Sequence, residues 1–349
     1  MSRYARPYIE GLSLYYDPKP GNALRMDTNT NPLGENPACQ QALKDCASME
    51  LGQYPSTYGG DLRQALAQLY SLDRENFVVG NGSDEILDII CKTYMQSSGR
   101  LVIAYPAYSL HGWFATVNGG TSVEVDLDGD FQLRVDAMVK APGDLVVICT
   151  PNNPTSNLFR ADDVKALLER SKRIVVIDEA YGEFAGESCI PLVKRYDNLI
   201  VTRTFSKAYA LAGLRIGYSV ANPDLTLEMQ KIRVPYSLDK VSEHAAVLAL
   251  QQQDFVSRAV DIVRRERPHL HRGLAELGLK PYPSDANFIL FRCPFESAEF
   301  VRRLAAKNVM VRDFGKKRLL QDCARTTIGT REQNDITLKA MAEVVRECR

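Results

Sequence analysis

The chain has 349 residues, of which 45% are hydrophobic and 25% are charged, as is ordinary for a globular protein of about two domains. Its 43 Lys and Arg residues balance 43 Asp and Glu residues, so no net field favours a nucleic-acid or anionic-membrane partner. No apolar run resembles a secretory signal or reaches the length of a membrane span, and we expect a cytoplasmic protein.

Short aliphatic runs recur in the first two thirds of the chain, and each ends in polar or small residues. They cover residues 77–79, 101–104, 145–149, 174–177 and 199–201. Such runs are typical of buried parallel strands. Helical periodicity occurs between them, as in residues 84–95, where Ile86, Ile90 and Tyr94 share one face. The alternation of strand and helix predicts an α/β fold.

The residues directly after these runs are candidates for a binding site, because ligands of open α/β sheets bind beyond the carboxyl ends of the strands. We expect them to converge at one edge of the sheet. In chain order they are Asn81, Gly82, Ser83, Asp84, Thr150, Asn152, Asn153, Asp178, Glu179, Tyr181, Thr204 and Lys207.

Gly82, Ser83 and Asp84 open a predicted helix, where free backbone N–H groups and the helix dipole favour an anion such as phosphate. Taken alone, the segment also fits an ordinary N-cap at Ser83 or Asp84. A dinucleotide site is a third interpretation, but Glu85 stands where the third glycine of that fingerprint is required.

Asp178 and Lys207 have the most specific chemistry in this set. Asp178 follows four branched residues, so its carboxylate needs a cation, either a protonated pyridine nitrogen or a nearby lysine or arginine. Lys207 lies beside Thr204 and Ser206, where desolvation could make it an amine nucleophile; alone it would be an ordinary surface lysine. With Arg215 as a phosphate ligand, these groups form the inventory of a pyridoxal phosphate site.

The last third of the chain has a different pattern. After residues 234–238 a long helical stretch covers residues 240–277, and we expect interruptions near Gln253 and Pro268. Strand-like segments follow at 287–291, 309–312 and 326–328, and we interpret residues 316–318 as a solvated turn rather than a binding patch. The eight cysteines lack paired C-x-x-C spacing, so we expect reduced core residues and no metal site.

Several motifs carry a resemblance to a known family: MDTNTNP, QYP, GNGSDE, YPAYS, TPNNPT, VIDEAY, RTFSKAYALAGLRIGY, PYSL and ARTTIGTRE. In this order they resemble the fold type I pyridoxal-phosphate-dependent aminotransferases, and within that group they are similar to the histidinol-phosphate aminotransferases. The resemblance runs from about Asp27 to the C-terminus. It implies a large domain, residues 30–238, with a mostly parallel seven-stranded sheet between helices. Residues 1–29 and 239–349 would form the N-terminal arm and a smaller α+β domain.

The resemblance implies a role for each matching residue in binding pyridoxal 5′-phosphate. Lys207 would bind the cofactor covalently and move the proton between substrate and cofactor. Asp178 would keep the pyridine nitrogen charged. Asn153 and Tyr181 would bind the phenolic oxygen, and Tyr108 would stack on the ring. The cofactor phosphate would be surrounded by Ser83, Asp84, Thr204, Ser206 and Arg215.

The resemblance also implies a partner chain and a substrate side. Tyr54 would reach the cofactor phosphate of a second copy, so we expect a homodimer; the alternative is a loop tyrosine held by Pro55. Arg312 and Arg325 would bind the anionic end of the substrate, with Asn29 nearby. Guanidinium groups suit phosphate and carboxylate equally well, and surface ion pairs are the other common use of such residues.

The implied reaction transfers the amino group of L-histidinol phosphate to 2-oxoglutarate, giving imidazole acetol phosphate and L-glutamate, in histidine biosynthesis. Alternatives are transamination of another amino acid, such as an aromatic one, and decarboxylation of a phosphorylated amino acid. A non-catalytic effector-binding regulator is a further alternative, but no basic extension suggests DNA binding. Thr30, Ser156 and His111 depart from the family pattern and bear on substrate specificity more than on the cofactor site.

Overall fold

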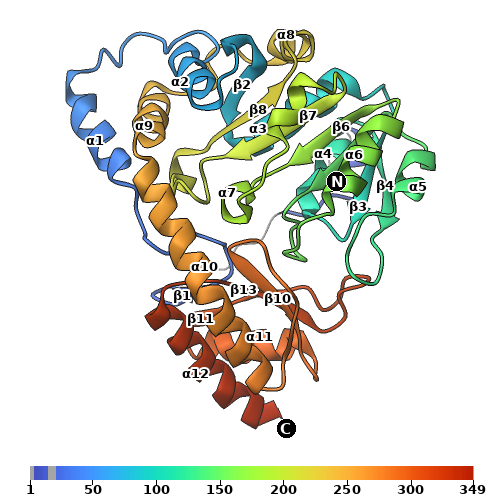
Figure 1. The fold of residues 1–349 in the computed structure, drawn as a ribbon, viewed down its shortest axis with the longest axis vertical. Helices are drawn as coiled ribbons and strands as arrows, with labels where there is room; N and C mark the ends of the chain where they lie inside the picture. Colours follow the sequence, from blue (N-terminus) through green and yellow to red (C-terminus); the bar gives the residue numbers. More distant parts are fainter. Residues whose placement is uncertain (1–3, 15–20, 349) are drawn as a thin grey trace.

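The computed structural model describes residues 4–14 and 21–348, which form a larger and a smaller part (Figure 1). The larger part is built around a broad twisted sheet with helices on both faces. The smaller part contains a second sheet and the C-terminal helix. Helix α10 (Gln253–Glu276) runs along one side from the larger part to the smaller one.

The large sheet has seven strands within the described residues, in the order β2-β8-β7-β6-β5-β3-β4. Strand β8 is antiparallel to both of its neighbours, and the other adjacent strands are parallel. The predicted mostly parallel seven-stranded sheet is therefore confirmed, and all five predicted aliphatic runs lie in its strands. The strands are β2 (Phe77–Asn81), β3 (Arg100–Tyr105), β4 (Thr121–Asp126), β5 (Leu145–Cys149), β6 (Ile174–Asp178), β7 (Leu199–Thr204) and β8 (Ile216–Ala221).

Helices cover both faces of this sheet because successive side chains of a strand point to opposite faces. In β5, Leu145 and Val147 belong to one hydrophobic cluster, and Val146 and Ile148 belong to the other. The first face is covered by α3 (Gly82–Tyr94), α4 (Ser109–Val117) and α8 (Pro223–Ile232). The second face is covered by α2 (Gly60–Tyr70), α5 (Val135–Lys140), α6 (Ala161–Arg170), α7 (Gly182–Ala185) and α9 (Lys240–Gln251).

The smaller part holds an antiparallel sheet with the order β12-β13-β10-β9. Its strands are β9 (Lys280–Pro281), β10 (Phe288–Arg292), β12 (Arg312–Asp313) and β13 (Cys323–Thr327), and its helices include α11 (Ser297–Ala306) and α12 (Arg331–Cys348). β1 (Leu24–Arg25) pairs in parallel with β11 (Val309–Met310), which ties the N-terminal segment to the C-terminal part. Helix α1 (Pro37–Asp45) packs with α9. The division at residue 238 stays a prediction.

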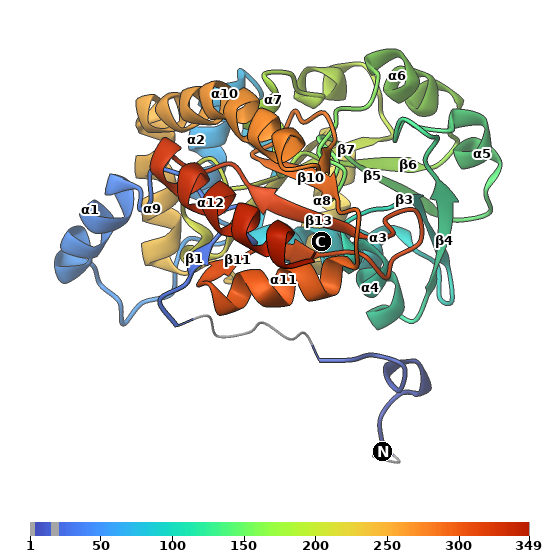
Figure 2. The ribbon, with the colours of Figure 1, turned by 90° about the horizontal axis from the view of Figure 1, so that it is seen from below.

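Short 3-10 helices complete the described chain: η1 (Pro7–Ile9), η2 (Cys46–Ser48), η3 (Arg74–Asn76), η4 (Ile190–Lys194) and η5 (Ala212–Leu214). The N-terminal segment with η1 runs outside the main body (Figure 2). It meets the body close to α4, where the Tyr8 ring lies near Gly119.

The long helical stretch is interrupted once, at Gln252, close to the predicted position. The predicted second interruption is wrong, because Pro268 lies inside α10. A proline removes one helical hydrogen bond, but Val263, Leu270 and Leu274 are buried on the core side of the helix and hold it continuous across that point.

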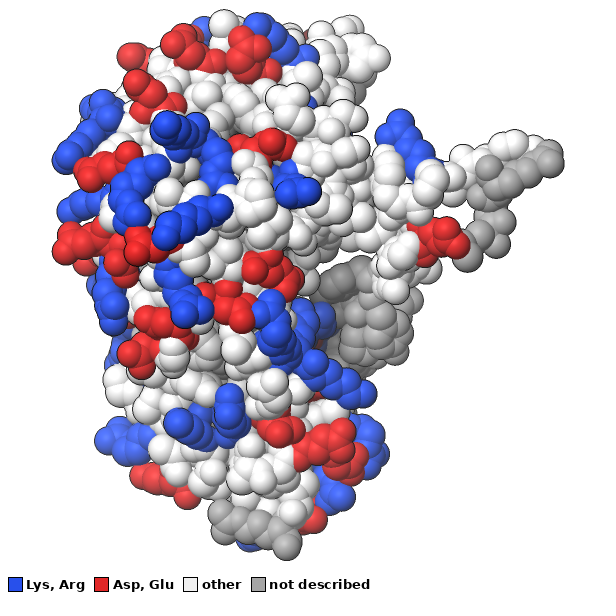
Figure 3. Space-filling model, turned by 90° about the vertical axis from the view of Figure 1, so that its right-hand side faces the viewer, with Lys and Arg blue, Asp and Glu red and all other residues white. Residues whose placement is uncertain are grey.

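The charged surface agrees with the balanced composition. On the face shown in Figure 3, Lys and Arg side chains are interspersed with Asp and Glu, so no broad patch of one sign covers it. In the part of the chain that the structure describes, no helix combines the length and apolarity needed to cross a membrane.

Candidate active site

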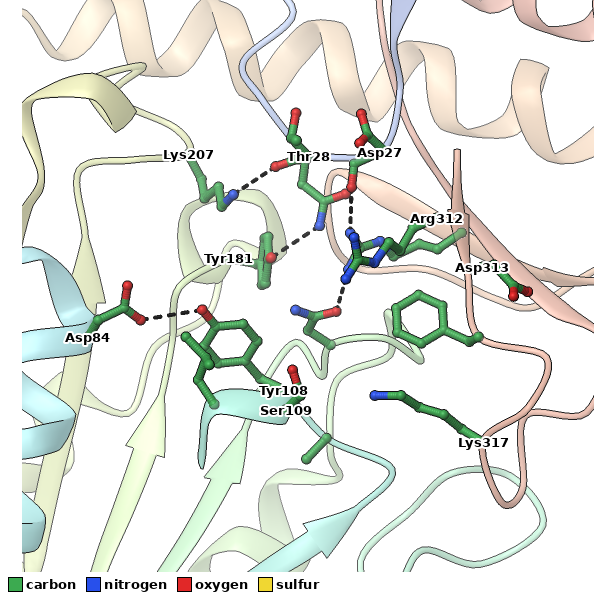
Figure 4. Close-up of a pocket in the computed structure, with 16 residues that line it drawn as sticks. Asp27, Thr28, Asp84, Tyr108, Ser109, Tyr181, Lys207, Arg312, Asp313 and Lys317 are labelled. Atoms are coloured by element: carbon green, nitrogen blue, oxygen red, sulfur yellow. Dashed lines mark hydrogen bonds between the residues drawn. The ribbon is translucent and has the colours of Figure 1, made fainter. Parts of the chain in front are cut away.

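A cavity of about 420 Å³ lies between the two parts of the molecule, at the carboxyl ends of the large-sheet strands (Figure 4). Eight of the predicted site residues line it, although they come from eight separate segments. They are Asn29, Asp84, Tyr108, Asn153, Tyr181, Lys207, Arg312 and Arg325. Of the twelve residues expected to converge at one edge of the sheet, Asp84, Asn153, Tyr181 and Lys207 line this cavity.

Lys207 follows β7 and reaches into this cavity. Its Nζ donates a hydrogen bond to the carbonyl oxygen of Thr28 at 2.8 Å and lies 5.9 Å from the ring centroid of Tyr181. Burial lowers the pKa of Lys207 to about 8, and the cations Arg325 and Arg215 add to this effect. The amine therefore exists in its neutral, nucleophilic form at much lower pH than an ordinary lysine.

Asp178 ends β6 and is only 3% exposed. His111 Nε2 lies 3.1 Å from Asp178 Oδ2, while the Thr202 hydroxyl donates to Oδ1 at 3.3 Å. With an ionised Asp178, His111 must donate from Nε2, and its buried Nδ1 has no hydrogen-bond partner in the described structure. The carboxylate is thus held by hydrogen bonds, and no lysine or arginine of the described residues forms an ion pair with it.

The residues of the predicted anion site lie where α3 begins. Asn81 is the N-cap residue and makes no side-chain cap bond, so the interpretation of Ser83 or Asp84 as the N-cap is wrong. Gly82 has φ +81°, and a Cβ at this position would lie 2.7 Å from Arg215 Nη2. A Cβ on Gly217 would collide with the backbone nitrogen of Ser83. Glycine at both positions therefore lets β8 and the guanidinium approach the start of the helix.

The side chains around this helix start form a connected set. Arg215 Nη2 donates to Asp84 Oδ2 at 2.9 Å, and the Tyr108 hydroxyl donates to Asp84 Oδ1 at 3.3 Å. Burial raises the pKa of Tyr108, and the Asp84 charge adds to the shift, so the hydroxyl keeps its proton. Thr204 Oγ1 and Ser206 Oγ lie 2.9 Å apart. A helix N-terminus, a guanidinium and two hydroxyls together are a donor set for a phosphate.

The opposite side of the cavity is formed by the small sheet and the N-terminal segment. Arg325, 7% exposed, donates to Asn153 Oδ1 at 2.5 Å and to the Asp27 carbonyl oxygen at 2.7 Å. Arg312 is its neighbour across the β12–β13 pair. Asn29 Nδ2 donates to the Tyr181 hydroxyl at 3.1 Å. Two guanidinium groups therefore stand beside the residues that surround Lys207.

The predicted site residue Tyr54 is not among the residues that line this cavity. It is 77% exposed, and its ring stacks on Tyr236 with centroids 4.7 Å apart. Exposed Leu51 and Val234 belong to the same two segments. Its predicted role in a second copy stays a prediction.

Sequence reasoning missed several residues of the site. His111 was noted only as a departure, since nothing local links it to a residue 67 positions away. Residues 316–318 form an exposed turn as predicted, but Lys317 also lines the cavity and Arg318 forms ion pairs with Glu124 and Asp126. The available signal was a run of three cations between the strand-like segments that carry Arg312 and Arg325.

Residues 22–341 match the family described as aminotransferase class I and II, and the chain belongs to this family. The expected fold and the pyridoxal-phosphate-dependent aminotransferase class are thereby confirmed.

The similar proteins point to one group within this family. The histidinol-phosphate aminotransferase of Ruminiclostridium cellulolyticum is 36% identical over 90% of each chain, and that of Pyrococcus furiosus is 34% identical over 93% of each. The solved histidinol-phosphate aminotransferase of Sinorhizobium meliloti, in complex with pyridoxal-5′-phosphate, superposes with a TM-score of 0.90 at 25% identity. That superposition covers 100% of this chain and 99% of the other.

Proposed function

We propose that this protein is an aminotransferase that uses L-histidinol phosphate as amino donor and 2-oxoglutarate as acceptor, giving imidazole acetol phosphate and L-glutamate. The observation that carries the proposal is a single cavity with the Lys207 amine near a phosphate donor set and with Arg312 and Arg325 opposite. This arrangement suits a substrate that is both an amine and an anion. Similarity to histidinol-phosphate aminotransferases supports the choice of donor. The reaction would serve histidine biosynthesis in the cytoplasm.

The residues present fit pyridoxal 5′-phosphate. When bound, this cofactor supplies an aldehyde for amines and a ring that withdraws electrons from the substrate carbon. Lys207 Nζ would bind it and then carry the proton at the substrate carbon. Asp178, held by His111 and Thr202, would stabilise a protonated ring nitrogen. Asn153 and Tyr181 would bind the phenolic oxygen.

The remaining cofactor contacts would come from residues already close together. Tyr108 would cover one face of the ring while its hydroxyl stays bonded to Asp84. The cofactor phosphate would be bound through backbone N–H groups or side chains of Ser83, Asp84, Thr204, Ser206 and Arg215.

On the substrate side, Arg325 would bind a carboxylate or phosphate in fork geometry, with Arg312 beside it. Asn29 would fix the Tyr181 hydroxyl from the same side. The proposed amino donor is an amine that carries a phosphate, and the acceptor is a keto acid that carries carboxylates. One pair of guanidinium groups would therefore serve both half-reactions.

We also propose a homodimer in which Tyr54 completes the site of the second copy. The support is an exposed apolar surface formed by four large side chains on two adjoining segments: Leu51, Tyr54, Val234 and Tyr236. Exposed apolar patches of this kind mark interaction sites on soluble proteins. Size-exclusion chromatography with light scattering tests the assembly. A monomer with full activity would contradict this part of the proposal.

The reaction is tested by mixing the holoenzyme with single amino donors and following the absorbance of the bound cofactor. We expect rapid conversion by L-histidinol phosphate, recovery on adding 2-oxoglutarate, and a weak response to phenylalanine. Lys207→Ala should abolish the conversion. Equal or faster conversion by phenylalanine, or release of carbon dioxide from a phosphorylated amino acid, would overturn the assignment of the donor.

A further inference from the structure

The loop between β12 and β13 is fastened to the larger part of the molecule by Arg318. Its Nη2 lies 2.7 Å from Glu124 Oε2, its Nη1 pairs with Asp126, and its Cζ lies 4.4 Å from the ring centroid of Tyr105. Glu124 and Asp126 belong to β4, and Tyr105 ends β3. The loop therefore crosses from the small sheet to the strand ends that border the active-site cavity.

This anchor places the preceding residue, Lys317, at the cavity. Lys317 lines it, and Figure 4 shows its ammonium pointing inward from the side opposite Lys207. The Lys317 Nζ lies 5.6 Å from the ring centroid of Phe314. Among the described residues, the Lys317 ammonium has no hydrogen bond or ion pair. Although much of the side chain is solvent-accessible, desolvation and the Arg312 cation lower the pKa of Lys317.

The cavity has a surplus of positive charge on this side. The carboxylates that line it already have partners. Asp84 lies 2.9 Å from Arg215, and Asp27 lies 2.7 Å from Arg25. Asp313 accepts hydrogen bonds from the Ser297 hydroxyl at 2.6 Å and from the Gly315 N–H at 2.9 Å. Asp313 accepts from neutral donors and keeps its charge, but Lys317, Arg312 and Arg325 outnumber it, so the field on this side of the cavity favours an incoming anion.

We propose that Lys317 is a specificity-determining residue, which binds the phosphate monoester of the amino donor and so favours a dianionic substrate end over a single carboxylate. The inference rests on the proposed function and adds to it. Arg325 can bind a carboxylate or a phosphate in fork geometry, whereas the Lys317 ammonium adds a further positive charge that matches the second negative charge of a phosphate monoester.

The test uses the holoenzyme of Lys317→Met, with Lys316→Met as the matched control. Lys316 is the adjacent exposed lysine and is not part of the cavity lining. Steady-state kinetics are measured with histidinol phosphate and with its dephosphorylated form, histidinol. Inhibition by inorganic phosphate is measured in parallel, and Lys317→Arg tests whether charge alone restores binding.

We expect Lys317→Met to raise KM for histidinol phosphate about tenfold, to weaken phosphate inhibition by a similar factor, and to leave KM for histidinol unchanged. Lys316→Met should match the original protein. Unchanged KM for histidinol phosphate, or an equal rise for both donors, would overturn the role of Lys317. If the original protein does not use histidinol phosphate, the proposed function fails. In that case, inhibition by phosphate is measured in the reaction with the donor that is active. This measurement decides the role of Lys317 independently of the proposed function.

Discussion

The pKa of Lys207 leads to a prediction that can be tested without substrate or cofactor. At a pKa of about 8, roughly a tenth of the amine is neutral at pH 7, against about 0.03% for a lysine at 10.5. The lowered value thus corresponds to a gain of roughly 300-fold in neutral amine at pH 7. The pKa of Lys207 is shifted downward, so the reactivity of its amine rises tenfold per pH unit below pH 8 and levels off above pH 8.

The assay is competitive labelling of the apoenzyme with a small amine-selective reagent at pH 6 to 9.5. Mass spectrometry of the peptide that contains Lys207 gives its rate, and the exposed Lys316 in the same sample serves as the reference. We expect the rate at Lys207 to reach a plateau close to pH 8 to 8.5.

Removing a nearby cation should move that plateau upward. Arg325 and Arg215 both lower the pKa of Lys207, so Arg325→Gln and Arg215→Gln should each shift the midpoint to higher pH. The upward shift of the midpoint should be smaller for Arg215→Gln than for Arg325→Gln, because the Arg215 guanidinium is partly exposed and Arg325 is buried. A labelling rate at Lys207 that keeps rising tenfold per unit up to pH 9.5 would refute the reasoning.

Three further predictions concern residues around the cavity. Gly217→Ala should destabilise the protein by about 1–3 kcal/mol and weaken pyridoxal phosphate binding, because the new Cβ meets the Ser83 backbone; thermal unfolding and cofactor titration check this. His111→Phe removes a hydrogen bond from buried Asp178 and should lower kcat about tenfold with little change in KM; a change in KM alone would contradict this role. Arg318→Met should free the loop and raise KM for histidinol phosphate while kcat is retained, and an unchanged KM would argue against the anchor.

The fold class could be predicted because buried strands have a local signature. Five aliphatic runs gave five strands of the large sheet, since a strand covered on both faces needs consecutive apolar residues. Strand β4 was missed because it is a partly exposed edge strand with polar residues at Thr121, Ser122 and Glu124. In the small sheet, β10 falls on the segment predicted at residues 287–291 and β13 overlaps the one predicted at 326–328, whereas β9 has two residues, too few for a pattern.

By itself, the sequence determined which residues follow the strands, and therefore the chemistry of Asp178 and Lys207 and the aminotransferase class. Only the tertiary structure decided their partners. Arg325 meets Asn153 across 172 positions, and Arg318 meets Glu124 across 194. Such contacts depend on how the small sheet packs over the large one, which no local pattern encodes. The same packing brings Lys317 into the cavity, so the side of the site that faces the substrate is a property of the folded chain.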